Sequence, residues 1–196
     1  MKEEQALRLF VAAELPPEAR RALHQGMERL KAVVAVPLRW VGVDGIHLTL
    51  KFLGAVPARR VPEVGDGLAR AVSDHAPFKL DLSKVGAFPN GRSPRVVWVG
   101  IGGGLEALAG VQHAVEEATA ELGFPKEVRE FTPHLTLARV RHPLTREEGK
   151  HLTATLQRIE TPGDQGFRVG SVSLVRSTLT PSGAVYATLK NWPLST

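Results

Sequence analysis

A four-residue motif, His-Leu-Thr-Leu, occurs twice in this chain and constrains its fold more than any other feature. The copies occupy residues 47–50 and, 87 positions later, residues 134–137. On a β-strand, successive side chains lie on opposite faces, so each histidine would share a face with its threonine while both leucines turn to the other side. Two such strands opposite each other would place two imidazoles and two hydroxyls around one cleft.

The amino-acid composition gives the number of such motifs expected by chance. With 7 histidines and 12 threonines among 196 residues, about 0.4 His-x-Thr pairs are expected by chance, and requiring both leucines lowers this to about 0.006. A single pair therefore says little, whereas two full copies are informative. A third triplet, at residues 151–153, falls in a predicted helix, where positions i and i+2 cannot share a face. We interpret that triplet as incidental.

The order of predicted elements also repeats. Before the triple glycine at 102–104, periodicity and turn residues predict helices at 17–33 and 58–75 and strands at 7–15, 39–41, 46–53, 78–85 and 95–101. After it they predict helices at 105–122 and 145–156 and strands at 132–140, 167–177 and 184–190. The triple glycine matches no nucleotide-binding pattern and is interpreted as a hinge.

These elements predict an α+β fold: a single bilobal domain over residues 1–196, with an approximate internal repeat of 17–101 and 105–190. We expect two lobes of antiparallel sheet, related by an approximate twofold axis, with helices outside. The two motif strands would form opposite walls of a central cleft.

Composition excludes several kinds of chemistry. The chain has no cysteine, which excludes disulfides, thiolate catalysis and cysteine-bound metals. A net charge of +5 fits a polyanionic partner without identifying one. No apolar run is long enough to span a membrane, and the N-terminal stretch is too short and acidic for a secretory signal. We therefore expect a cytoplasmic protein without a membrane partner.

Paired imidazoles suit acid–base chemistry on a phosphodiester. Near neutral pH, one of His47 and His134 can act as a base while the other, protonated, acts as an acid. The hydroxyls of Thr49 and Thr136 can donate hydrogen bonds to the non-bridging oxygens. The reaction requires neither a metal nor a cofactor, and a strained RNA 2′,3′-cyclic phosphate is an especially suitable substrate.

Arg139 extends the second motif with a group that binds phosphate in bidentate fashion. Strict alternation places it on the face opposite His134, so it would need a bulge or the end of the strand to reach the site. Its counterpart in the first half is Phe52, so the two histidines need not share one role.

Other interpretations stay open for these residues. Each histidine could be a structural residue bonded to backbone, and a zinc site is conceivable although no carboxylate neighbours either motif in strand register. Lys51 lies in register with His47 and could add charge to the cleft, or it could be solvated. Three aromatic residues are candidates for stacking on a base, although each could instead belong to the core; they are Phe10, Trp40 and Phe131.

Longer runs around the motifs carry a family resemblance. They are Arg-Leu-Phe-Val-Ala at 8–12, Arg-Trp-Val at 39–41, Ile-His-Leu-Thr-Leu-Lys-Phe-Leu-Gly at 46–54, Gly-Ala-Phe-Pro at 86–89 and Phe-Thr-Pro-His-Leu-Thr-Leu-Ala-Arg at 131–139. Together they resemble the RNA 2′,3′-cyclic phosphodiesterases, also called 2′-5′ RNA ligases, of the two-histidine phosphoesterase superfamily.

The resemblance implies a bilobal fold and hydrolysis of RNA 2′,3′-cyclic phosphate ends to 2′-phosphate ends. It implies His47 as the proton donor, His134 as the proton acceptor, and Thr49, Thr136 and Arg139 as substrate-binding residues. We expect a monomer that acts on RNA ends, with tRNA halves as candidate substrates. Two alternatives are a 2′-5′ ligase that joins tRNA halves and a non-catalytic binder of RNA ends.

Overall fold

The computed structural model describes residues 5–89, 93–159, 166–181 and 183–195. Up to residue 103 the elements are β1 (Ala6–Ala13), α1 (Pro17–Val33), β2 (Leu38–Trp40), β3 (Leu48–Pro57), α2 (Val61–Val72), β4 (Phe78–Phe88) and β5 (Val96–Gly103). The remainder forms α3 (Leu105–Glu121), β6 (His134–Val140), α4 (Arg146–Gln157), β7 (Phe167–Val169), β8 (Ser171–Thr180) and β9 (Gly183–Pro193). Short 3₁₀ turns cover Val43–Gly45 and Ala58–Arg60.

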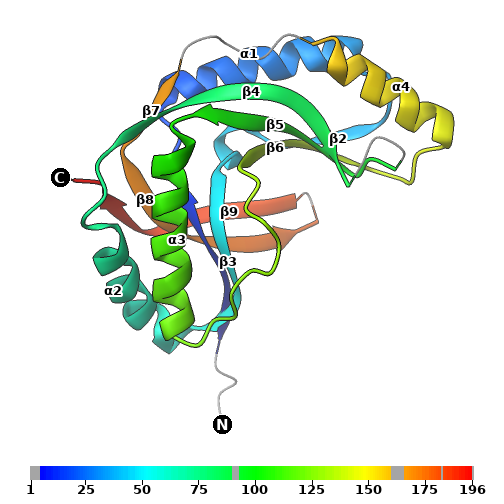
Figure 1. Cartoon of the computed structure of the whole chain (residues 1–196). Helices are drawn as coiled ribbons and strands as arrows, with labels where there is room; N and C mark the ends of the chain where they lie inside the picture. Colours follow the sequence, from blue (N-terminus) through cyan, green and yellow to red (C-terminus); the bar gives the residue numbers. More distant parts are fainter. Residues whose placement is uncertain (1–4, 90–92, 160–165, 182, 196) are drawn as a thin grey trace.

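The strands form two antiparallel sheets, with the orders β3-β1-β8-β9 and β2-β6-β5-β4-β7. Figure 1 shows α1 and α4 along the outer side of the five-stranded sheet, and α2 and α3 side by side next to the four-stranded sheet. The predicted α+β fold, with two lobes of antiparallel sheet and outer helices, is confirmed.

Each sheet takes strands from both halves of the sequence. The first motif strand, β3, lies in one sheet with β8 and β9, whereas the second, β6, lies in the other with β4 and β5. The lobes therefore interlock, and no single point in the sequence separates them. The internal repeat of 17–101 and 105–190 stays a prediction based on element order.

Local signals account for the helix ends. Pro17 opens α1, where its fixed φ suits the first turn. Thr145 and Glu148 form a reciprocal capping box at the start of α4, and Gly123 follows α3 with a φ of +84°. These helices agree with the predicted ranges because caps and apolar periodicity act within a few residues.

One buried cluster fills the space between sheets and helices. It includes the motif leucines, each 4% exposed or less: Leu48, Leu50, Leu135 and Leu137. A separate small cluster of Phe10, Ala12 and Val175, with Tyr186 against it, lies outside this core. We call the sheet face opposite the motif leucines the open face.

The triple glycine is not a hinge, so that prediction is wrong. Gly102 and Gly103 pair with β4 inside strand β5, and the amide of Gly104 donates to the carbonyl of Lys79 at 3.0 Å. A Cβ at Gly104 would lie 2.6 Å from that carbonyl oxygen. Glycine is needed there for close backbone approach rather than for chain freedom.

Two predicted strand limits are also wrong. The strand expected at 167–177 divides at Gly170, because β7 pairs with β4 while β8 pairs with β1 in the other sheet. The first motif strand does not end at Gly54, whose φ is +73°, but continues to Pro57 against β1. Pairing partners far away in the sequence decide both limits.

Lys51 does not face the motif histidine. It is 5% exposed, and its ammonium donates to the carboxylate of Glu116 in α3 and to the carbonyl of Pro125 at 2.6 Å. The amide of Glu127 donates to the same carboxylate at 2.7 Å. The predicted orientation of Lys51 is wrong because β3 carries an extra residue at Leu50, which reverses its alternation.

We predict that Lys51→Met lowers the free energy of unfolding by about 3 kcal/mol, because it leaves the Glu116 carboxylate buried without its cation. Denaturant titration measures the loss. Lys31→Met is the matched control, since its pair with Glu28 is exposed and screened by solvent, so its loss should cost far less stability than that of Lys51. Equal losses of unfolding free energy in the two variants would contradict a stabilising role for the buried pair of Lys51 and Glu116.

Candidate functional site

Both His/Thr pairs lie on open faces. His47 follows the 3₁₀ turn directly before β3, and His134 begins β6. These histidines and their partners Thr49 and Thr136 are partly exposed, whereas the motif leucines are buried. Residues of β3 and β6 contact each other although the strands belong to different sheets. The fold therefore brings the two motif strands together.

The same irregularity interrupts both motif strands. The pairing of β3 with β1 shifts by one residue at Leu50, and the pairing of β6 with β5 shifts by one residue at Leu137. Each is the second leucine of its tetrapeptide. A bulge of this kind adds one residue to one strand and reverses which face the following side chains occupy.

The bulges decide the positions of Arg139 and Phe52. After its bulge, Arg139 returns to the face of His134, opposite Val96 of β5. Phe52 returns to the open face of its own sheet, opposite Phe10 of β1. Of the two arrangements expected to bring Arg139 to this face, a bulge or the end of the strand, the bulge is present. The bulge in β3 places an aromatic ring at the corresponding position.

The two imidazoles are held in the same tautomer. Nδ1 of His47 lies 3.0 Å from the carbonyl oxygen of Gly45, and Nδ1 of His134 lies 2.7 Å from that of Thr132. A carbonyl only accepts, so each Nδ1 carries the proton and donates. In the neutral ring Nε2 then has a free lone pair. Each histidine can accept a proton at that atom.

The ring of His47 sits in an aromatic pocket. It stacks on Phe10 with a centroid distance of 4.4 Å and meets Tyr186 edge-on at 4.8 Å. Burial lowers the pKa of His47 to about 4, against the opposing effect of its bond to Gly45, and the charge of Arg20 lowers it further. The imidazole is therefore neutral at pH 7 in the free protein.

His134 has different aromatic neighbours. Phe88 meets its ring edge-on with a centroid distance of 5.0 Å, and Trp98 lies at 6.3 Å. The indole nitrogen of Trp98 is buried and has no hydrogen-bond partner in the part of the chain that the structure describes. The two histidines share a tautomer and an aromatic setting, but their neighbours differ.

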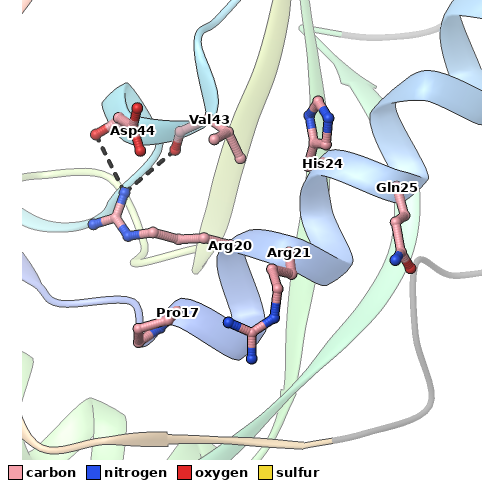
Figure 2. Close-up of a pocket in the computed structure, with 7 residues that line it drawn as sticks. All are labelled: Pro17, Arg20, Arg21, His24, Gln25, Val43 and Asp44. Carbon is pink, nitrogen blue, oxygen red and sulfur yellow. Dashed lines mark hydrogen bonds between the residues drawn. The ribbon is translucent and has the colours of Figure 1, made fainter.

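Arg20 supports the backbone turn that orients His47. From α1 its guanidinium donates to the carbonyls of Val43 at 3.3 Å and Asp44 at 3.2 Å, as Figure 2 shows. The next carbonyl, that of Gly45, accepts the Nδ1 proton of His47. Sequence reasoning did not single out Arg20, because no motif marks it and the two turn carbonyls that it contacts lie 23 and 24 positions away.

A shallow pocket of about 340 Å³ lies beside this arginine (Figure 2). Its lining comes from the start of α1 and the 3₁₀ turn: Pro17, Arg20, Arg21, His24, Gln25, Val43 and Asp44. It contains neither motif histidine, and the guanidinium of Arg20 is already bonded to carbonyl oxygens. We therefore assign the candidate site to the open faces that carry the paired motif.

The three predicted stacking aromatics are part of the packing. Phe10 is 2% exposed beneath His47, and Trp40 and Phe131 are half-buried against the core. Phe52, which the sequence argument named only as the counterpart of Arg139, is 64% exposed on the open face. The bulge explains the difference, because it moves the ring away from the core.

No three side chains of the metal-binding types cluster among the residues with described positions. Within the same residues, no helix is long and apolar enough to cross a membrane.

Comparison with known proteins adds independent evidence. Residues 44–180, which include both motifs and Arg139, match the family model described as the 2′-5′ RNA ligase superfamily. The chain belongs to this superfamily. A relative from Aeropyrum pernix, named RNA 2′,3′-cyclic phosphodiesterase, is 36% identical over 169 residues, which cover 83% of this chain and 92% of the relative.

Other relatives agree in name and in fold. A Thermus thermophilus protein with the same name is 36% identical over 199 residues, covering 96% of this chain and 90% of its own. The crystal structure of TT0787 from Thermus thermophilus superposes with a TM-score of 0.80 at 29% identity, covering 96% of this chain and 98% of the other. That of E. coli LigT complexed with 3′-AMP gives 0.76 at 28% identity, covering 97% and 99%.

We predict that His47 makes stability depend on pH. Its folded pKa of about 4 lies below the unfolded value near 6.5, so the unfolded chain binds the proton first as the pH falls. The free energy of unfolding should fall by about 2 to 3 kcal/mol between pH 7 and 4.5 through this residue. Denaturant titrations of wild type and His47→Gln at both pH values measure it.

His151→Gln is the control for this titration, since that ring is exposed on α4. In His151→Gln the free energy of unfolding should depend on pH as in wild type. In His47→Gln it should lose the fall of about 2 to 3 kcal/mol between pH 7 and 4.5. An unchanged pH dependence in His47→Gln would contradict the burial of a neutral imidazole.

Proposed function

We propose that this protein is an RNA 2′,3′-cyclic phosphodiesterase that hydrolyses cyclic phosphate ends to 2′-phosphate ends without a metal or cofactor. The observation that carries the proposal is the matched pair of imidazoles. His47 and His134 each donate Nδ1 to a carbonyl, which leaves the same nitrogen, Nε2, to accept a proton, and the motif strands that carry them contact each other. Relatives that carry this name, at 36% identity over most of the chain, support the same activity.

The reaction needs one base and one acid. A water oxygen attacks phosphorus, its proton passes to the neutral Nε2 of one histidine, and the bond from phosphorus to the 3′-oxygen breaks. The other histidine, protonated, delivers its proton to that 3′-oxygen, which leaves as a hydroxyl. The product keeps its phosphate on the 2′-oxygen, and the two histidines exchange protonation states.

We assign His47 as the proton donor and His134 as the proton acceptor. Because the pKa of His47 is about 4 in the free protein, it must take up a proton as substrate binds. A phosphate anion beside the ring favours the imidazolium and raises that pKa. The aromatic pocket strengthens this attraction by excluding water.

The remaining predicted residues hold the substrate. Thr49 and Thr136 lie two positions beyond the histidines on the same faces, and neither hydroxyl forms a hydrogen bond with a described residue. Both can donate to non-bridging oxygens, where charge develops in the transition state. Arg139 reaches the same face through its bulge and contacts the substrate phosphate.

The family description favours one alternative, the joining of RNA ends through a 2′-5′ linkage. The same acid and base can catalyse this joining with an RNA 5′-hydroxyl in place of water: its oxygen attacks phosphorus, the bond from phosphorus to the 3′-oxygen breaks, and the phosphate then links the 2′-oxygen to the 5′-oxygen. Rates of hydrolysis and joining on tRNA halves, measured under the same conditions, distinguish the two reactions. A non-catalytic binder of RNA ends would show neither reaction.

The first test uses RNA that ends in a 2′,3′-cyclic phosphate, incubated with the protein in excess EDTA. We expect conversion to a 2′-phosphate end at the rate found without the chelator, since the two imidazoles supply both proton transfers. Electrophoresis with phosphatase and ligation assays identifies the end formed. No conversion, or conversion restored only by added metal, would refute the proposal.

The second test removes each imidazole in turn. His47→Ala and His134→Ala should each lower kcat by about 10²- to 10⁴-fold, the usual range for a lost acid or base. Circular dichroism checks that the fold persists. His151→Ala, which alters the incidental triplet on α4, should keep wild-type kcat. A near-wild-type rate in either motif variant would mean that the two-histidine mechanism is wrong.

A further inference from the structure

Tyr186 lies against His47 although it belongs to neither motif. It is on β9, the last strand of the chain, where it stands opposite Ser177 of β8. Its ring meets the imidazole of His47 edge-on, with a centroid distance of 4.8 Å and an interplanar angle of 78°. It meets the ring of Phe10 in the same way at 5.6 Å. The imidazole is therefore in contact with two aromatic rings, one from β1 and one from β9.

The same tyrosine covers the residue that fixes the tautomer of His47. A Cβ at Gly45 would lie 3.4 Å from Cε2 and 3.5 Å from Cδ2 of Tyr186, so the ring lies directly over this glycine. The carbonyl of Gly45 accepts the Nδ1 proton of His47 at 3.0 Å. Tyr186 thus contacts both residues of the hydrogen bond that leaves Nε2 of His47 available for proton exchange.

The two aromatic contacts restrain the imidazole in different directions. Phe10 stacks on the face of the His47 ring at 4.4 Å with an interplanar angle of 29°, so it opposes tilting of the imidazole. Tyr186 is nearly perpendicular at the edge, so it opposes movement of the imidazole within its own plane. A displacement of about 1 Å between reacting groups can lower a rate by about 100-fold. The edge contact therefore bears directly on proton transfer.

Tyr186 also contributes to the burial of the imidazole. Burial is the main cause that lowers the pKa of His47 to about 4, and the charge of Arg20 lowers it further. The charged groups near the ring are Arg20 from α1, its ion-pair partner Glu14 after β1, and the exposed Asp44 in the 3₁₀ turn. The contact from β9 is the phenol ring itself. Removing this ring therefore changes the burial of the imidazole and leaves those charges in place.

We propose that Tyr186 is a positioning residue for His47: its aromatic ring, rather than its hydroxyl, holds the imidazole in the orientation in which Nε2 exchanges a proton with the substrate. The inference rests on the proposed function and adds to it a residue outside both motifs. The ring is sufficient for this role, because ring atoms make the contacts with His47 and Gly45. Phenylalanine at this position should therefore preserve the role, and an aliphatic side chain should lose it.

The kinetic test compares wild type with Tyr186→Phe, Tyr186→Leu and Trp192→Leu on RNA that ends in a 2′,3′-cyclic phosphate. Trp192 is the matched control, since it packs from the same strand against the main core. We expect Tyr186→Leu to lower kcat about 10- to 100-fold with little change in KM, because a displaced imidazole impairs proton transfer more than binding. Tyr186→Phe and Trp192→Leu should keep kcat near the wild-type value.

Three kinetic results would overturn the inference. They are an equal loss of kcat in Tyr186→Phe and Tyr186→Leu, which would make the hydroxyl the important group; wild-type kcat in Tyr186→Leu; and an equal loss in Trp192→Leu. Circular dichroism checks the fold of each variant. Tyr186→Met, whose unbranched side chain fills a similar volume without a ring, should show the same loss as Tyr186→Leu and replaces it in the comparison if the leucine variant does not fold.

NMR of the histidine rings separates this inference from the proposed function, because it needs no turnover. Long-range ¹H–¹⁵N spectra report the tautomer and the pKa of His47. We expect the Nδ1-protonated ring and a pKa of about 4 in wild type and Tyr186→Phe. In Tyr186→Leu we expect a mixture of tautomers and a pKa nearer the ordinary value, because water reaches the ring.

If wild type hydrolyses no cyclic phosphate, the proposed phosphodiesterase fails, and the NMR comparison still tests the role of Tyr186. A change of the His47 tautomer and pKa in Tyr186→Leu but not in Tyr186→Phe would support the inference. The same tautomer and pKa in wild type and both variants would overturn it.

Discussion

The candidate site depends on the bulge at the second leucine of each motif. Leu50 and Leu137 occupy the same place in their tetrapeptides, and each shifts the pairing with the neighbouring strand. Ahead of the bulge, leucines enter the core and His/Thr pairs face out; beyond it the pattern reverses. Without the bulge, Arg139 would point into the helix-covered core, and a charged group would lie there without a partner.

The reversal also links the site to the stability of the fold. It turns Lys51 inward, where the carboxylate of Glu116 compensates its charge and joins β3 to α3. The same reversal leaves the ring of Phe52 exposed on the open face of β3. A buried ion pair and an exposed aromatic ring are thus two results of one backbone irregularity, and neither follows from residue type alone.

The two histidines share a tautomer but differ in the side chains that pack against their rings. Both donate Nδ1 to a carbonyl two residues upstream, which leaves Nε2 available on each. Only His47 lies stacked on a ring from β1, beside a turn that an α1 arginine fixes. The Phe52/Arg139 difference already indicated in the sequence that the histidines need not share one role, and the packing of His47 gives that asymmetry a physical cause.

The sequence by itself determined the helices, most strands, the α+β class and the paired His/Thr motif, because caps, periodicity and a repeated tetrapeptide act over short distances. Tertiary structure alone decided which sheet each strand joins, the role of Gly104, and the faces of Lys51 and Arg139. It also placed Arg20 behind His47 and Tyr186 against the ring of His47. These features depend on pairing between segments far apart in the chain, and a one-residue shift in that pairing exchanges the two faces of a strand.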